Sequence, residues 1–162
     1  MKNKNLSFMT QAAMIAAIYV VLTYIFAPFS FGEVQVRISE ALTILPIFTP
    51  AAIPGLFAGC LIGNILGGAI FPDIVFGSIA TLIGAFFTWK LREQKTVVAT
   101  FPPIISNIII VPFVLRYGYG VTLPIPFMML TVGIGEVISC TVLGMIVYGA
   151  LKKYKSTLFR TA

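Results

Sequence analysis

The sequence contains five acidic residues, and one of them, Glu136, lies in the middle of a long apolar stretch. A carboxylate near the centre of a bilayer costs about 2.5 to 3.5 kcal/mol on insertion scales, so it is expected to face other helices and to have a partner or a function. Glu136 lies about 15 Å along its apolar stretch, near the middle of a membrane, where we expect no other acid. Glu136 is therefore the first candidate for binding a polar ligand. The alternative is a protonated Glu136 that bonds a neighbouring helix.

Other polar residues sit in or beside apolar stretches. Asn64 and Asn107 are placed by their distance from the helix ends in the outer half of the membrane, where an amide either holds helices together or contacts a substrate. Asp73 follows Pro72 at the start of a helix, so it is either a cap or a site residue. The candidate substrate-binding residues are Glu136, Asn64, Asn107, Asp73, Glu40 and Arg37.

The residue inventory excludes several chemistries. There is no histidine, so catalysis by histidine and ordinary histidine metal sites are excluded. No G-x-x-x-x-G-K-[ST] loop occurs, so the chain is not expected to hydrolyse ATP. We therefore predict no catalytic residue, no metal site and no cofactor, and a requirement for an energy-supplying partner if transport is concentrative.

The composition of the chain predicts that these residues are carried by membrane helices. Hydrophobic residues make up 59% of the chain, charged residues 10%, and the mean hydropathy is +1.02. A soluble domain has roughly 25% charged residues. The net charge of +6 comes from cations at the ends of apolar runs, which indicates membrane topology and no nucleic-acid binding. The fold class is an all-α integral membrane protein in the lipid bilayer, with a single domain over residues 1–162.

Six transmembrane helices are predicted. Three prolines, Pro46, Pro50 and Pro54, should separate a short helix from the next one. With six crossings, the three basic clusters all lie on one side of the membrane, which places both termini in the cytoplasm. The predicted helices cover residues 8–29, 40–48, 51–70, 74–91, 97–115 and 125–151.

Two further segments have suggestive patterns. The alternation over residues 34–38 is typical of a strand and could form a lid over an outer cavity. The first helix contains two overlapping pairs of small residues at i and i+4, which allow another helix to approach closely, in this chain or in a partner. These candidates for a partner interface are Ala12, Ala13, Ala16 and Ala17.

Four blocks resemble one known family. They are residues 34–46 (VQVRISEALTILP), residues 48–55 (FTPAAIPG), the pair Gly63-Asn64 and residues 73–78 (DIVFGS). This pattern resembles the QueT family, substrate-binding S components of energy-coupling-factor (ECF) transporters, over residues 11–151.

The resemblance implies a six-helix, multi-pass subunit of the bacterial plasma membrane. Such a subunit binds a queuosine precursor, a 7-deazaguanine base, from outside, and it works with a transmembrane scaffold subunit and two cytoplasmic ATPase subunits. It also implies that the small residues of the first helix face the scaffold. Two alternatives remain open from the residues alone: an S component for another vitamin, and a membrane scaffold protein without a ligand.

Overall fold

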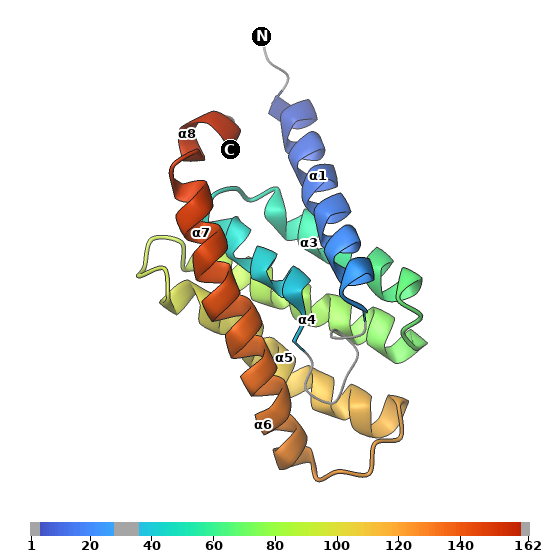
Figure 1. The fold of residues 1–162 in the computed structure, drawn as a ribbon. Coiled ribbons are helices and arrows are strands. Elements are labelled where there is room, and N and C mark those ends of the chain that lie inside the picture. Colours follow the sequence, from blue (N-terminus) through green and yellow to red (C-terminus); the bar gives the residue numbers. More distant parts are fainter. Residues whose placement is uncertain (1–3, 28–35, 160–162) are drawn as a thin grey trace.

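The computed structural model describes residues 4–27 and 36–159, and this part of the chain is helical and has no strand (Figure 1). Six helical regions fit the six predicted ones, counting contiguous segments together. The first four regions are the single helices α1 Lys4–Ile25, η1 Ile38–Ile47, α3 Ala52–Leu66 and α4 Phe71–Lys90. The fifth region consists of η2 Val98–Thr100, α5 Phe101–Phe113 and η3 Val114–Gly118. The sixth consists of α6 Ile125–Glu136, η4 Val137–Leu143 and α7 Gly144–Lys152. A short α8 Lys155–Leu158 follows.

Four of the described helical stretches are long and apolar enough to cross a membrane: Lys4–Ile25, Phe71–Lys90, Val98–Gly118 and Ile125–Lys152. The other two, η1 and α3, are apolar but shorter. At about 1.5 Å per residue, the 20 residues of α4 extend about 30 Å, which matches the hydrocarbon thickness of a bilayer.

The proline-rich region separates η1 from α3. Pro46 lies inside η1, and the chain then leaves the helix over residues 48–51 before α3 begins at Ala52. η1 is a 3-10 helix of ten residues, far longer than the usual run of three or four. Eight consecutive residues of it, Ser39 to Pro46, are buried, so η1 runs through the centre of the bundle.

α1 and α3 approach each other closely because α3 carries glycine at every fourth position on the face toward α1. A Cβ on Gly55 would lie 2.7 Å from the Ala12 carbonyl oxygen, and one on Gly59 would lie 2.7 Å from the Tyr19 Cβ. Real Cβ atoms essentially never approach so closely, so each position requires glycine. This contact fixes α1, and with it Tyr19, against the centre of the bundle.

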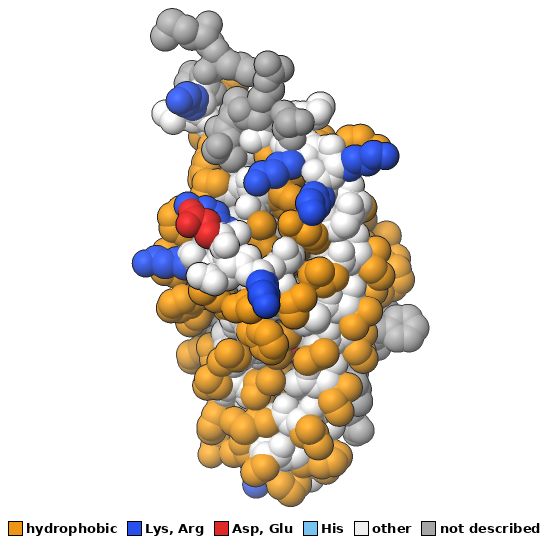
Figure 2. All heavy atoms as spheres, turned by 90° about the vertical axis from the view of Figure 1, so that its left-hand side faces the viewer, with side chains coloured by type: hydrophobic (Ala, Val, Ile, Leu, Met, Phe, Trp, Pro, Cys, Tyr) orange, Lys and Arg blue, Asp and Glu red, His pale blue; other side chains and the backbone are white. Residues whose placement is uncertain are grey.

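The surface is largely apolar and the interior contains polar groups. Large hydrophobic side chains such as Met9, Phe71 and Leu130 are more than 60% exposed, whereas Glu40, Asn64 and Glu136 are buried. Figure 2 shows Lys and Arg side chains gathered toward the end where α1 begins and α7 ends, with hydrophobic side chains over most of the remaining face. This distribution is that of a membrane protein, which exposes apolar groups to lipid and encloses polar ones.

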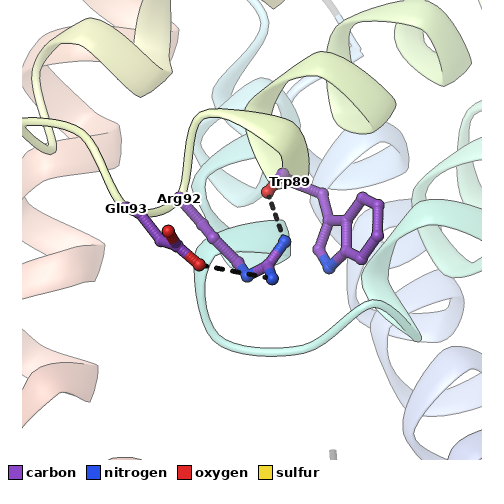
Figure 3. A network of polar contacts seen from close by, with 3 residues as sticks. All are labelled: Trp89, Arg92 and Glu93. Atoms are coloured by element: carbon purple, nitrogen blue, oxygen red, sulfur yellow. Dashed lines mark hydrogen bonds and ion pairs between the residues drawn. The ribbon is translucent and has the colours of Figure 1, made fainter.

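The end of α4 carries an aromatic and charged cluster (Figure 3). The Arg92 guanidinium lies 4.6 Å from the centre of the Trp89 ring and donates a 3.1 Å hydrogen bond to the Trp89 carbonyl oxygen. Glu93 lies 3.6 Å from the same guanidinium. Tryptophan beside basic residues is typical of a membrane interface.

Several predicted boundaries differ from the structure. The third region ends at Leu66 instead of residue 70, and the fifth continues past residue 115 as the π-helical segment η3 to Gly118. Residues 28–29 of the predicted first helix and residues 34–35 of the predicted lid lie outside the described residues. Ile38, the last residue of that alternation, begins η1.

Candidate substrate-binding site

Glu40 lies on η1, at the centre of the bundle. Its side chain is fully buried, and its carbonyl oxygen accepts a 2.6 Å hydrogen bond from Thr43 Oγ1 one turn further on. The Oε1 atom accepts hydrogen bonds from the Tyr19 hydroxyl of α1 and, at 3.3 Å, from the Thr81 hydroxyl of α4. The other oxygen, Oε2, has no hydrogen-bond partner among the described residues. Glu40 therefore has one oxygen held by the protein and one available to a ligand.

Glu136, the last residue of α6, lies beside Glu40. One carboxylate oxygen of each acid and the Cys140 Sγ all lie within 4.8 Å of one another. Cys140 donates a 3.2 Å hydrogen bond to Glu136 Oε2, and Asn107 of α5 is a second hydrogen-bond neighbour of Glu136. The prediction that Glu136 is the only acid near the middle of the membrane was therefore wrong, because η1 carries Glu40 to the same place.

A second set of polar groups adjoins this pair. Arg37, just before η1, donates a hydrogen bond from Nη2 to Asn64 Oδ1. Asn64 in turn donates to the Asp73 carbonyl oxygen at 3.2 Å. The Asp73 side chain accepts a 2.9 Å hydrogen bond from the Tyr119 hydroxyl. These contacts connect η1, α3, α4 and the loop after η3.

The electrostatics link the two sets. The Arg37 guanidinium interacts electrostatically with both Glu40 and Asp73. The two sets together contain three buried carboxyl groups, on Glu40, Asp73 and Glu136, and one described cation, Arg37. Because acids outnumber the cation, this site favours a ligand that carries a positive charge or several N–H donors.

Tyr119 lies at the outer edge of this network, beyond the membrane-spanning segments. Partial burial, and next the adjacent Asp73 carboxylate, raise the pKa of Tyr119 to about 12. The phenol therefore stays protonated at neutral pH and continues to donate its hydrogen to Asp73.

Sequence comparison supports a transporter. The sequence pattern of the QueT transporter family matches residues 9–153, which is most of the chain. The chain belongs to the QueT transporter family. It is also 33% identical over 84 residues to a curated protein of Lactococcus lactis subsp. cremoris named "Queuosine precursor transporter QueT". That match covers 51% of this chain and 48% of the relative, so the chain spans about half the length of the curated relative. No solved structure matches the chain.

In this member of the QueT family, all six predicted site residues are buried and join one polar network. Three further residues that hydrogen-bond the two central acids were not predicted from the sequence: Tyr19, Thr81 and Cys140. A tyrosine within an apolar helix was the available signal, because a buried phenol needs a hydrogen-bond partner.

The structure also brings together groups that could coordinate a metal ion, although the sequence predicted no metal site. Glu40, Glu136 and Cys140 offer two oxygen ligands and one sulfur ligand within 4.8 Å. Oxygen and thiolate ligands together suit zinc. Arg37 interacts with the same acid, Glu40, and its fixed positive charge opposes a divalent cation there.

The four alanines of α1 divide between two faces. Ala12 and Ala16 are half-buried and contact the glycines of α3, whereas Ala13 and Ala17 are exposed. The exposed pair forms one face with Met14 and Ile18, which are 59% and 47% exposed.

Proposed function

We propose that this chain is the substrate-binding membrane subunit of an ECF-type importer and that it binds a queuosine precursor, a 7-deazaguanine base, from outside the cell. The family and the name of the relative support this class of substrate. The observation that carries the proposal is the convergence of Glu40, Glu136, Asn64, Asn107 and Arg37 in one buried network.

The chemistry of the base fits these groups. A guanine-like edge presents adjacent N–H donors, which a carboxylate accepts in bidentate fashion. Amides such as Asn64 and Asn107 can pair with the carbonyl oxygen and the ring nitrogens of the base. Glu40 Oε2 is buried without a partner among the described residues, and a ligand N–H would satisfy it.

Binding to the purified chain tests this proposal. Titration with 7-aminomethyl-7-deazaguanine in detergent should give saturable, one-to-one binding, with adenine as a control ligand whose donor pattern differs. A scaffold protein without a ligand would show no saturable binding of either compound in this titration. An S component for another vitamin would bind a member of a vitamin panel in preference to the deazaguanine.

Uptake requires energy, so we further propose that the chain works with a transmembrane scaffold subunit and two cytoplasmic ATPase subunits. The exposed Ala13 and Ala17 of α1 form the contact surface for the scaffold, because their small side chains let a partner helix approach. Co-purification of all four subunits with a tagged chain supports this assembly, and purification of the tagged chain alone from cells that take up the base contradicts it.

The proposed location is the bacterial plasma membrane, with both termini in the cytoplasm. The supporting observation is that Lys and Arg side chains gather toward the end of the molecule where α1 begins and α7 ends (Figure 2). Single cysteines at Lys95 and Gly118, in a background without Cys60 and Cys140, should react with an impermeant thiol reagent from opposite sides. Labelling of both positions from outside the cell contradicts this orientation.

A further inference from the structure

The central acids form a pair with unusual surroundings. Glu40 is fully buried, Glu136 is 4% exposed, and their nearest carboxylate oxygens lie within 4.8 Å. Two carboxylates that share a buried site repel each other, and one of them keeps a proton unless a positive charge lies between them. The protonation of Glu40 and Glu136 therefore depends on how much positive charge the surrounding residues supply.

The titratable groups around the pair come from α1, α3, α4 and η4 and from the residue just before η1. Tyr19 of α1, Cys60 of α3 and Cys140 of η4 are neutral when protonated, so they contribute hydrogen-bond donors and no compensating charge. Asp73 of α4 adds a third acid. Arg37 is the described cation facing this group, and it is shared between Glu40, Asp73 and the Asn64 amide. One guanidinium does not neutralise three carboxylates, so the empty site retains an excess of negative charge or holds a proton.

The hydrogen bonds within the protein leave one carboxylate oxygen of this pair, Glu40 Oε2, without a donor among the described residues. Glu40 Oε1 receives two donors, Tyr19 and Thr81, and Glu136 Oε2 receives one donor, Cys140. Asn107 is a further hydrogen-bond neighbour of Glu136, so both acids accept hydrogen bonds from the protein. Glu40 Oε2 is buried without a partner among the described residues, so a proton on this carboxyl group or a ligand N–H can still be placed there.

We propose that Glu40 and Glu136 share one proton in the empty site and release it when a substrate bearing a protonated amine binds between them, so that the site selects a cationic base over a neutral one. This inference rests on the proposed function. The charges balance: one proton leaves a carboxyl group for bulk water, and one ammonium group takes its place. A neutral 7-deazaguanine supplies no such charge, so the pair keeps its proton.

The proposal predicts a pH dependence with a definite sign. Binding of the amine requires the pair to lose its proton, so affinity rises with pH, by up to tenfold per unit, until the pair is fully ionised in the empty protein. Affinity falls again only when the ligand amine itself deprotonates, near the pKa of about 10 of an alkylamine. Affinity for neutral 7-deazaguanine stays flat over the same range.

Calorimetry on the full chain in detergent tests this. We would titrate 7-aminomethyl-7-deazaguanine and 7-deazaguanine, each at several pH values and in two buffers with different ionisation enthalpies. The expected result is release of up to one proton per amine bound, none per neutral base, and at least tenfold tighter binding of the amine. Infrared difference spectra should show a protonated carboxyl band that disappears when the amine binds.

Variants make the assignment specific. Glu40→Gln should abolish both the proton release and the preference for the amine, whereas Glu93→Gln, at an exposed acid outside the site, should leave both unchanged. Amine binding with no proton release and no pH dependence would overturn the shared proton while leaving the proposed function intact. Binding of neither base would overturn the proposed function itself, and this inference with it.

Discussion

The Tyr19 hydroxyl donates a hydrogen bond to Oε1 of Glu40, and this contact ties the first helix to the buried 3-10 helix at the centre of the bundle. Tyr19 is itself fully buried and belongs to the same hydrophobic cluster as Leu42, Leu56 and Cys60. The position of the central carboxylate therefore depends on the packing of α1 against α3, which a glycine face makes possible.

The first prediction follows from this hydrogen bond. Tyr19→Phe keeps the ring in the core but removes a donor to a buried carboxylate, which should lower the free energy of unfolding by about 1 to 3 kcal/mol. Tyr24→Phe is the matched control, because Tyr24 lies on the same helix and is 66% exposed. Thermal unfolding of both variants in detergent measures the difference, and equal stability of the two would show that the Tyr19 hydroxyl contributes nothing.

The second prediction concerns the glycine face of α3. Gly59→Ala places a Cβ 2.7 Å from the Tyr19 Cβ and 3.1 Å from the Ala16 Cα, atoms that cannot move without shifting α1. We expect destabilisation of about 1 to 3 kcal/mol. Gly149→Ala on α7 meets no atom within 4 Å and should be neutral or stabilising. A Gly59→Ala variant that unfolds at the same temperature as Gly149→Ala would contradict the close approach of α1 and α3.

The third prediction uses the raised pKa of Tyr119. Because its pKa in the folded protein, about 12, lies above the ordinary value near 10, the stability that this phenol contributes is complete below pH 10 and is lost as the pH rises toward 12. Ultraviolet titration of the folded protein should show one tyrosine ionising near pH 12, and Tyr119→Phe should remove that step. A step that survives in the variant assigns it to another tyrosine.

The fourth prediction separates association from binding. Ala17→Trp adds a bulky ring to the exposed face of α1 and should abolish uptake in cells, while the purified variant binds the deazaguanine with unchanged affinity. Ile134→Trp, on the exposed face of α6, is the control and should leave uptake unchanged. Normal uptake with Ala17→Trp would remove this face of α1 from the partner interface.

The sequence predicted the helices better than the site. Apolar length, the prolines at 46, 50 and 54 and the basic clusters indicate six helical regions without any knowledge of packing. The proximity of Glu40 to Glu136 was not predicted, because the predicted helix began at Glu40 and this residue was counted with the outer loop. The structure starts the helix at Ile38 and winds it as a 3-10 helix, which rises by about 2.0 Å per residue.

The alanine pattern had a similar limit. Small residues at i and i+4 indicate a close helix contact but do not identify the partner helix. The missing signal was on α3, where Gly55, Gly59 and Gly63 repeat at the same spacing and face α1. Two complementary small-residue faces, one on the first helix and one on the third, would have assigned Ala12 and Ala16 to a contact within the chain.

We propose that Glu136 binds the substrate, and the substitution Glu136→Gln measures how much its carboxylate contributes. The substitution keeps the shape of the side chain but removes its charge and replaces one acceptor with a donor. The loss of a buried charge-assisted contact should weaken binding of 7-aminomethyl-7-deazaguanine by at least about a hundredfold, roughly 3 kcal/mol, while the fold survives because a neutral amide is less costly in a membrane interior. Titration of the monodisperse variant beside Glu93→Gln gives the answer: a hundredfold loss confined to Glu136→Gln is the predicted result, and near-normal affinity in a folded Glu136→Gln variant would contradict the claim.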